Sequence, residues 1–156
     1  MEQEIIIKNI KNEPRSKVTM SDKYAFENCA IAAPYMGNKC FVTAYSIPPG
    51  KSNFPYHYHA ATEEIFYIIS GTGVLETPKG DANVTDGDVI VMPAGSAGAH
   101  RLTNSSNDMP LVYLDVSAPA ELDVVFYPHS NKLMAIANGI RKVYRIDSDV
   151  DYLDGE

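Results

Sequence analysis

The sequence is divided into many short apolar runs by turns rich in glycine and proline, and this alternation limits the possible folds more than any other feature. No stretch longer than about ten residues combines the apolar period of an amphipathic helix with capping residues. The runs are rich in β-branched and aromatic residues and are predicted to be strands: 4–7, 40–47, 65–69, 89–92, 111–116, 124–127 and 142–146. Segment 24–36 is ambiguous between one helical turn and a strand. Short strands separated in this way predict an all-β sandwich or barrel.

The length of the chain agrees with one such unit. Its 156 residues fit a domain of roughly 100–200 residues that needs no disulfide to fold. We predict a single domain over residues 1–156, with its core at roughly 38–117 and with an N-terminal strand and a C-terminal segment as extensions. Unbroken apolar runs such as 65–69 are far short of the roughly 18 residues of a membrane helix, so no membrane partner is expected.

Charge and cysteine content limit the expected partners and the expected cellular compartment. The chain has 13 Lys and Arg against 20 Asp and Glu, a formal net charge of −7, which argues against a nucleic-acid partner because phosphate binding needs clustered basic residues. Acidic residues crowd the last ten positions without a basic one, which is typical of a solvated chain end. The two cysteines, Cys29 and Cys40, make no disulfide framework, and the first residues lack a signal-peptide pattern. We therefore expect a cytoplasmic protein with reduced thiols.

The histidines are placed where metal chemistry would need them. His57 and His59 are two residues apart, so in an extended strand both imidazoles point to the same face. Glu63 and Glu64 open the next apolar run, and His100 comes from a further one. A lone histidine in a strand is ordinarily structural, but two imidazoles beside a carboxylate suit first-row divalent metals.

Two stretches of the chain resemble the two motifs of the cupin family. Residues 50–71, GKSNFPYHYHAATEEIFYIISG, resemble the first motif, and residues 87–104, GDVIVMPAGSAGAHRLTN, resemble the second. The resemblance implies a cupin-type jelly-roll β-barrel with one divalent metal ion per chain. It also implies the ligands of that ion: His57, His59, Glu64 and His100.

The spacing departs from the cupin motifs at two places. Six residues separate Gly50 from His57 where the motif has five, and four separate Gly95 from His100 where the motif has two. Two extra residues widen a loop but preserve the alternation of a strand, so we still expect His100 to face inward.

The choice between the adjacent glutamates rests on spacing and parity. Counting back from Gly71, the motif places its glutamate at Glu64. Glu64 also shares a strand face with Phe66 and Ile68, whereas Glu63 lies on the opposite face. Glu64 is therefore the predicted ligand.

The predicted ligand set favours an oxygen-rich ligand. Three neutral imidazoles and one carboxylate leave a residual positive charge and open coordination positions on a divalent ion, which suits a keto acid, an enolate, a catecholate or dioxygen. These ligands do not select among Fe, Mn, Ni, Co and Zn. Candidate pocket residues by position are Tyr45, Tyr56, Tyr58, Phe66, Met92 and Leu102.

These features leave two classes of function open. The first is a small metal-dependent enzyme, an oxygenase-like oxidoreductase acting on a small oxygen-rich organic anion. The second is a non-catalytic module that binds or senses such a molecule. A sugar phosphate isomerase is less favoured, because Arg101 should point outward and no other cation is clearly placed beside the ligands. A two-barrel decarboxylase is also less favoured, because it needs about twice this length. The sequence assigns no role to His129.

The N-terminal run Ile5-Ile6-Ile7 predicts self-association. An isolated barrel would leave this apolar run on an exposed edge, and a second copy of the chain would cover it. We therefore expect a homodimer.

Overall fold

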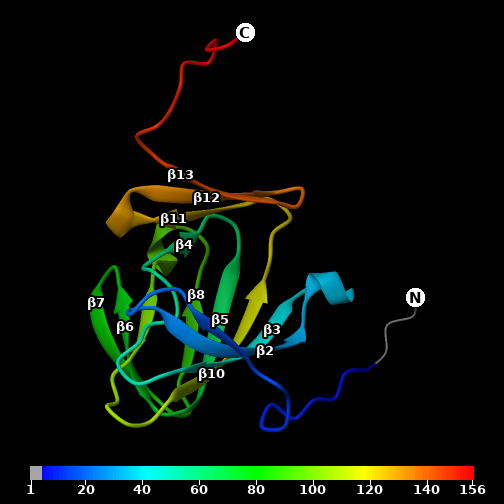
Figure 1. Cartoon of the computed structure of the whole chain (residues 1–156), viewed down its shortest axis with the longest axis vertical. Coiled ribbons are helices and arrows are strands. Elements are labelled where there is room, and N and C mark those ends of the chain that lie inside the picture. The colour runs from blue at the N-terminus through cyan, green and yellow to red at the C-terminus, as the bar shows by residue number, and fades with distance from the viewer. Residues whose placement is uncertain (1–4) are drawn as a thin grey trace.

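The computed structural model describes residues 5–156 and is built almost entirely of strands (Figure 1). The strands are β1 (Ser16–Thr19), β2 (Ala25–Ala32), β3 (Phe41–Ile47), β4 (Tyr58–His59), β5 (Glu63–Ser70), β6 (Thr72–Thr77), β7 (Gly80–Thr85), β8 (Val89–Met92), β9 (Arg101–Asn104), β10 (Leu111–Ala118), β11 (Asp123–Tyr127), β12 (Lys132–Ala137) and β13 (Ile140–Arg145). Short 3-10 helices are η1 (Pro34–Met36), η2 (Ser96–Gly98) and η3 (Pro128–Ser130). The predicted all-β class is confirmed. In the described part of the chain, no helix is long and apolar enough to cross a membrane.

The strands form three antiparallel sheets. The largest has the order β1-β2-β3-β10-β5-β8, the second has the order β13-β12-β11-β4, and the third has the order β7-β6-β9. Many neighbours in these sheets are distant in the sequence, as where β10 lies between β3 and β5. This order of strands is that of a jelly roll, although the sheets do not close into a continuous barrel.

The hydrophobic core lies between the six-stranded and the three-stranded sheet. Alternation along each strand turns one apolar row inward: Phe66 and Ile68 of β5 are at most 1% exposed, whereas Ile65 and Tyr67 are 39% and 46% exposed. The core comprises Ile47, Phe66, Ile68, Leu75, Val84, Met92, Leu102, Leu111 and Tyr113. Burying each large apolar side chain contributes about 1.5–3 kcal/mol, so this core holds the two sheets together.

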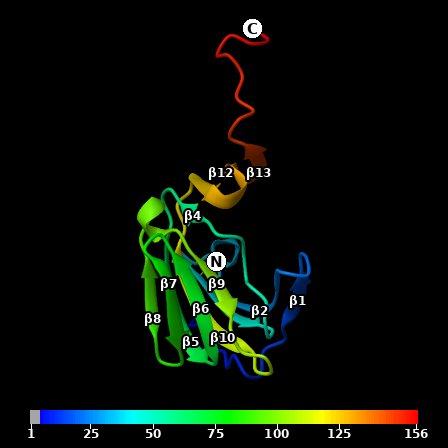
Figure 2. The ribbon, with the colours of Figure 1, turned by 90° about the vertical axis from the view of Figure 1, so that its left-hand side faces the viewer.

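The four-stranded sheet lies across one end of this sandwich (Figures 1 and 2). Directly opposed residues in antiparallel strands share a face. Asp123 of β11 opposes Ile136 of β12, and Ile136 in turn opposes Arg141 of β13. These three side chains therefore lie on one face of the sheet, and all three line the cavity beneath it.

Both ends of the chain extend beyond the sheets. The predicted N-terminal strand is wrong for residues 5–7, which form no strand, and its first residue, Glu4, lies outside the described residues. Ile5 and Ile7 are 91% exposed, and without a neighbouring strand their backbone groups have no ladder to join. Segment 24–36 contains both of the structures considered for it, namely β2 followed by η1. The acidic C-terminal residues are exposed and project away from the sheets (Figure 2).

Candidate metal centre

Three histidines converge on one carboxylate at the end of the sandwich that the four-stranded sheet covers. The Oε2 atom of Glu64 lies 3.9 Å from Nε2 of His57, 3.8 Å from Nε2 of His59 and 3.6 Å from Nε2 of His100. Donor atoms of His57, His59 and Glu64 all lie within 4.8 Å of one another, a grouping that could hold a metal ion. His100 is not one of those three residues, but its Nε2 atom lies close to the same oxygen of Glu64.

Backbone pairing brings these side chains together. The His57 amide donates to the His100 carbonyl at 3.0 Å, and the His100 amide donates to the His57 carbonyl at 2.8 Å. His59 lies in β4 opposite Val125 of β11, and Glu64 lies on the buried face of β5. Glu63 is exposed on the other face, as the parity of the strand predicts.

Each imidazole has its Nδ1 atom engaged away from the cluster. The acceptors are the Pro55 carbonyl at 2.8 Å for His57, the Gly98 carbonyl at 2.9 Å for His100 and Asp123 Oδ2 at 2.6 Å for His59. An Nδ1 that donates leaves Nε2 as the unprotonated nitrogen of a neutral ring. All three Nε2 lone pairs are thus available toward Glu64.

Burial keeps two of these imidazoles neutral. Desolvation, with the nearby His100 as the next cause, lowers the pKa of His57 to about 3, and desolvation lowers the pKa of His100 to about 4. The Nε2 of His100 is buried without a hydrogen-bond partner among the described residues. Such an orphaned acceptor costs about 1–3 kcal/mol, and a bound cation would satisfy it. The residues therefore fit a divalent ion.

Glu64 is also poised for a cation. Burial, followed by repulsion from Asp115 and Asp123, raises the pKa of Glu64 to about 8. A carboxyl group in this environment holds its proton at neutral pH unless a positive charge stabilises the anion. An ion at the cluster would supply that charge and displace the proton.

The extra residues before His100 are accommodated in a tight turn. Residues 96–98 form η2, and Gly95 just before it has φ +87°, a left-handed conformation that favours glycine. A side chain at Gly98 would collide with the carbonyl oxygen of Pro93. The turn thus absorbs the insertion, and His100 faces inward at 2% exposure.

Asp123 is a part of the site that the sequence analysis missed. Besides the bond to His59, Asp123 accepts a hydrogen bond from the Ala61 amide at 2.9 Å. Burial alone would raise the pKa of Asp123, but hydrogen bonds from His59, Thr62 and Ala61 hold it below its ordinary value. Asp123 therefore stays anionic and fixes the orientation of His59.

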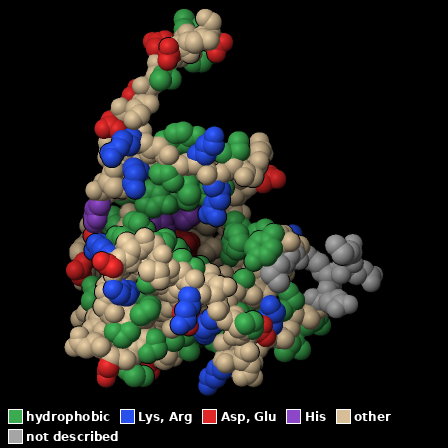
Figure 3. Space-filling model, viewed as in Figure 1, with side chains coloured by type: hydrophobic (Ala, Val, Ile, Leu, Met, Phe, Trp, Pro, Cys, Tyr) green, Lys and Arg blue, Asp and Glu red, His purple; other side chains and the backbone are tan. Residues whose placement is uncertain are grey.

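A cavity of about 630 Å³ opens beside the cluster. Figure 3 shows histidine side chains in a hollow beneath the four-stranded sheet, with Lys and Arg side chains nearby. The cavity reaches His57, His59 and Glu64 at its inner end and is walled by Tyr45, Phe54, Tyr127, Met134 and Ile136, among others. This volume suits a small organic molecule.

Two charged side chains in this cavity also went unpredicted. Asp115 of β10 is 8% exposed, and its Oδ1 accepts a hydrogen bond from Ser117 at 2.6 Å. Burial raises the pKa of Asp115 to about 6. Arg141 of β13 lies on the cavity wall, so a cation that the sequence analysis did not identify shares the cavity with the proposed ligands. The alternation of residues in 111–116 could have shown from the sequence that Asp115 is buried. The position of Arg141 could not be read in this way, because it depends on tertiary packing.

The other residues singled out from the sequence have different places. Of the candidate pocket residues, Tyr45 lines the cavity, whereas Phe66, Met92 and Leu102 belong to the core. Tyr56 stacks on His129 at 4.5 Å between ring centroids, and Tyr58 stacks on Phe126. The Nε2 of His129 lies 3.3 Å from Glu76, outside the cavity.

Comparison with known proteins agrees with this architecture. Residues 44–117 match the family model described as a cupin domain. An uncharacterized protein of Methanocaldococcus jannaschii is 32% identical over 85 residues, which cover 54% of this chain and 65% of that protein, slightly less than two thirds of its length.

Two solved structures share the fold over nearly the whole chain. One is a putative sugar phosphate isomerase from Acidithiobacillus ferrooxidans, with a TM-score of 0.80, 24% identity and 90% of each chain covered. The other is a sugar phosphate isomerase from Silicibacter pomeroyi, with a TM-score of 0.76, 18% identity and coverage of 94% of this chain and 96% of the other. At this identity the likeness establishes the fold alone.

Proposed function

We propose that this chain, whose residues 44–117 match the family model of a cupin domain, is a metal-dependent enzyme that holds a small, oxygen-rich organic anion on one divalent ion. The observation that carries this proposal is the arrangement of nitrogens around Glu64. The three Nε2 atoms lie 3.6–3.9 Å from Glu64 Oε2, and every Nδ1 is engaged elsewhere. The proposed ligands are His57, His59, Glu64 and His100.

The bound ion would act as a Lewis acid toward a substrate oxygen. The protein residues then define what else the site can do. Tyr127, Met134 and Ile136 line the cavity beside the cluster and would shield one side of a bound substrate from water. The residual positive charge of the centre favours an anionic chelator, and the apolar walls strengthen that attraction by lowering the local dielectric constant.

We favour proton transfer as the reaction, because Asp115 supplies a carboxylate outside the ligand set. It is buried beside the cavity, and its pKa of about 6 makes it ionised at neutral pH. In an isomerisation, Asp115 would take a proton from one carbon of a hydroxycarbonyl compound and return it to the adjacent carbon. At the same time the hydroxyl proton would move between the two oxygens. Sugar phosphates, in the names of the two similar structures, belong to this class of compound.

Two other functions remain to be distinguished by experiment. An oxygenase would use the same ligands with iron and would consume dioxygen. A binding or sensing module would hold the anion without turnover. In that case the Asp115 carboxyl, which accepts a hydrogen bond from Ser117, would have a structural role.

The proposal is tested in two steps: binding of metal by the protein, and then binding of a chelating organic anion by the metal-loaded protein. Protein purified without added metal should be stripped, titrated with Mn, Fe, Co, Ni and Zn, and analysed for one ion per chain. A panel of keto acids, hydroxyaldehydes and catechols should then perturb the visible spectrum of the cobalt-loaded protein. A chain that binds no metal, or a metal centre whose spectrum no member of the panel changes, would contradict the proposed function.

A further inference from the structure

We infer that Arg141 and Tyr127 form a second binding point in the cavity, which takes a terminal carboxylate or phosphate of the molecule held at the metal centre. The inference rests on the proposed function and adds to it a class of substrate: an anion with a chelating end and a distal oxyanion. The grounds are the position of Arg141, its lack of a partner and the continuity of the wall that joins it to the histidines.

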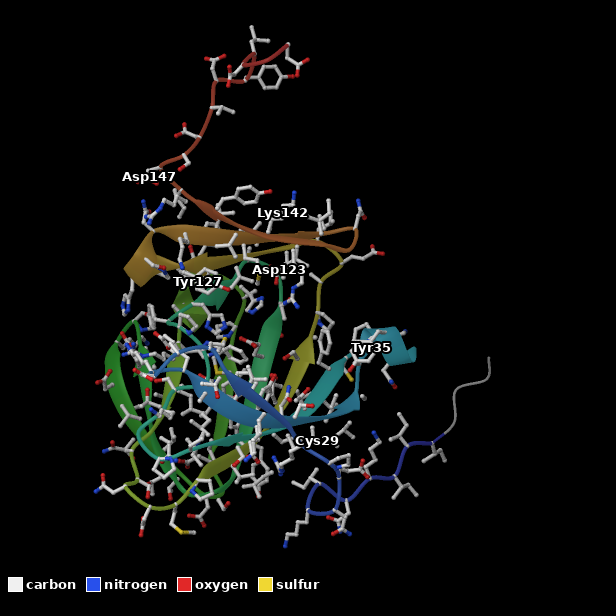
Figure 4. The ribbon with its side chains drawn as sticks, in the orientation of Figure 1. Cys29, Tyr35, Asp123, Tyr127, Lys142 and Asp147 are labelled. Carbon is white, nitrogen blue, oxygen red and sulfur yellow. The ribbon has the colours of Figure 1, made fainter. Side chains whose placement is uncertain are left out.

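The position of Arg141 follows from the register of the hairpin β12–β13. Arg141 opposes Ile136 directly, and Met134 lies two residues before Ile136 on the same strand face. All three residues line the cavity. Lys142, the next residue, lies on the opposite face of the hairpin, above the sheet, whereas Asp123 and Tyr127 lie on its lower side (Figure 4).

The guanidinium has no counter-charge within the described residues. No acidic side chain in residues 5–156 lies within 4.0 Å of it, and none accepts a hydrogen bond from it. The two acids that line the cavity besides Glu64 already have hydrogen-bond partners: Asp123 has His59 and Ala61, and Asp115 has Ser117. The donors of Arg141 are therefore available to a ligand.

The wall between the two binding points is continuous. The Tyr127 ring stacks on His57 with centroids 6.1 Å apart and an angle of 25° between the rings. Tyr127 and Arg141 also lie on the same face of the four-stranded sheet, and both line the cavity. One side of the cavity thus leads from a proposed metal ligand, through a phenol, to a cation.

This arrangement suits an oxyanion at the mouth of the cavity. A guanidinium binds carboxylate or phosphate through two parallel hydrogen bonds, and the Tyr127 hydroxyl can donate a third. Arg141 is exposed, so it lies where an incoming anion would meet it before reaching the histidines. Met134 and Ile136 beside it provide an apolar surface that strengthens the ionic contact.

The experiment compares ligand pairs that differ only in the distal oxyanion. 2-Oxoglutarate is matched with 2-oxopentanoate, and 3-phosphoglycerate with glycerate. Dissociation constants for all four are measured by calorimetry on the cobalt-loaded protein, on Arg141→Gln and on Lys142→Gln. The two variants lose the same charge at adjacent residues on opposite faces of one strand, so Lys142→Gln controls for long-range electrostatics.

In the unaltered protein we expect the distal oxyanion to tighten binding at least about tenfold in one of the pairs, as charge-assisted hydrogen bonds do. The pair that shows the advantage identifies carboxylate or phosphate as the group bound. Arg141→Gln should abolish the advantage while leaving the chelating-only partner unaffected, and Lys142→Gln should keep it.

Two results would overturn the inference and have different meanings. If the chelating-only compounds bind but neither pair shows an advantage, or if Arg141→Gln keeps the advantage, Arg141 is no anion site and the proposed function stands. If none of the four compounds binds the cobalt-loaded protein, the inference fails, and the proposed function fails with it only if no member of the panel of keto acids, hydroxyaldehydes and catechols binds either.

Discussion

The Nδ1 atom of His59 lies 2.6 Å from the Oδ2 atom of Asp123, across 64 positions of sequence. This contact links β4 to the start of β11 and orients one imidazole of the cluster. Because the carboxylate is anionic, it also raises the electron density on the ring and so the basicity of the nitrogen that faces Glu64.

Replacing Asp123 by Asn should therefore weaken metal binding without removing a ligand. The amide can still accept the Nδ1 proton, but it lacks the negative charge, so we expect the dissociation constant to rise by about 10–100-fold. Competition with a chromophoric chelator measures the change. Glu121→Gln changes an exposed acid in the connection just before β11 and is the control; equal affinities for the two variants would contradict the role of Asp123.

Glu64→Gln should weaken metal binding far more than Glu63→Gln. The amide keeps the shape of the side chain but removes the one anionic group of the proposed ligand set, whereas Glu63 points to solvent from the other face of β5. We expect a loss of at least about 100-fold for Glu64→Gln and little change for Glu63→Gln, measured by calorimetry. A loss of similar size in both variants would show that the carboxylate ligand has been misassigned.

The parts of this fold that are predictable from sequence are those that rest on local pattern. Alternation of apolar residues predicts β5 and β10 within a few residues of their bounds. The same alternation selects the face of Glu64, because Phe66 and Ile68 must be buried. The strands β6 and β7 were not predicted, since β6 mixes glycine and polar residues with only two large apolar ones, and β7 is mostly polar and exposed.

The outer part of the site could not be predicted for a physical reason. Arg141 faces the cavity only because β13 pairs with β12 and that hairpin folds across the end of the sandwich. Nothing in the local sequence of Ile140–Arg145, where apolar and basic residues mix, indicates which face is covered. Asp123 likewise becomes meaningful only once β11 lies beside His59.

The stability of the metal-free protein should be nearly constant between about pH 4.5 and 6 and should fall above about pH 6.5. The lowered pKa values of His57 and His100 mean that the unfolded chain binds more protons below pH 6.5, so these groups make stability rise with pH up to that point. Asp115 and Glu64 act in the opposite sense, because their raised pKa values keep protons on the folded protein. The two effects nearly cancel up to about pH 6, and above pH 6.5 the effect of Glu64 outweighs that of the histidines, so stability falls until the Glu64 pKa of about 8.

The fall between pH 6.5 and 8 amounts to about 1 kcal/mol. Urea unfolding in the presence of a chelator, at both pH values, measures it. Glu64→Gln should show no such fall, because the amide does not titrate. If the metal-free protein and the variant respond alike to pH, Glu64 is not held protonated by burial.

We propose that the chain forms a homodimer through its exposed N-terminal isoleucines. Ile5 and Ile7 are each 91% exposed and Ile6 is 42% exposed, and apolar surface of this kind is stabilised by a second copy. Light scattering should report twice the 17.1 kDa chain mass at tens of micromolar, an order-of-magnitude range for a stable dimer.

Serine at both Ile5 and Ile7 should shift the protein toward monomer. Serine at both Val89 and Val91, which are 63% exposed on β8, should not. A monomer at this concentration would refute the proposal.

The reaction itself can be identified by following protons and dioxygen together. If Asp115 transfers a proton, the metal-loaded protein should exchange deuterium from heavy water into the carbon beside the carbonyl of a chelated hydroxycarbonyl compound, with oxygen uptake at background. Asp115→Asn keeps the size and the contact with Ser117 but cannot accept a proton, so exchange should fall by about 10²–10⁴-fold. Affinity for metal and for the compound should hold, which separates loss of a base from loss of the site. His59→Ala should instead lose both, because it removes a proposed ligand.

Oxygen uptake with iron and the same compound would point to the oxygenase, while tight binding without exchange or uptake would point to the binding module. Exchange that survives in Asp115→Asn would place the base elsewhere in the cavity.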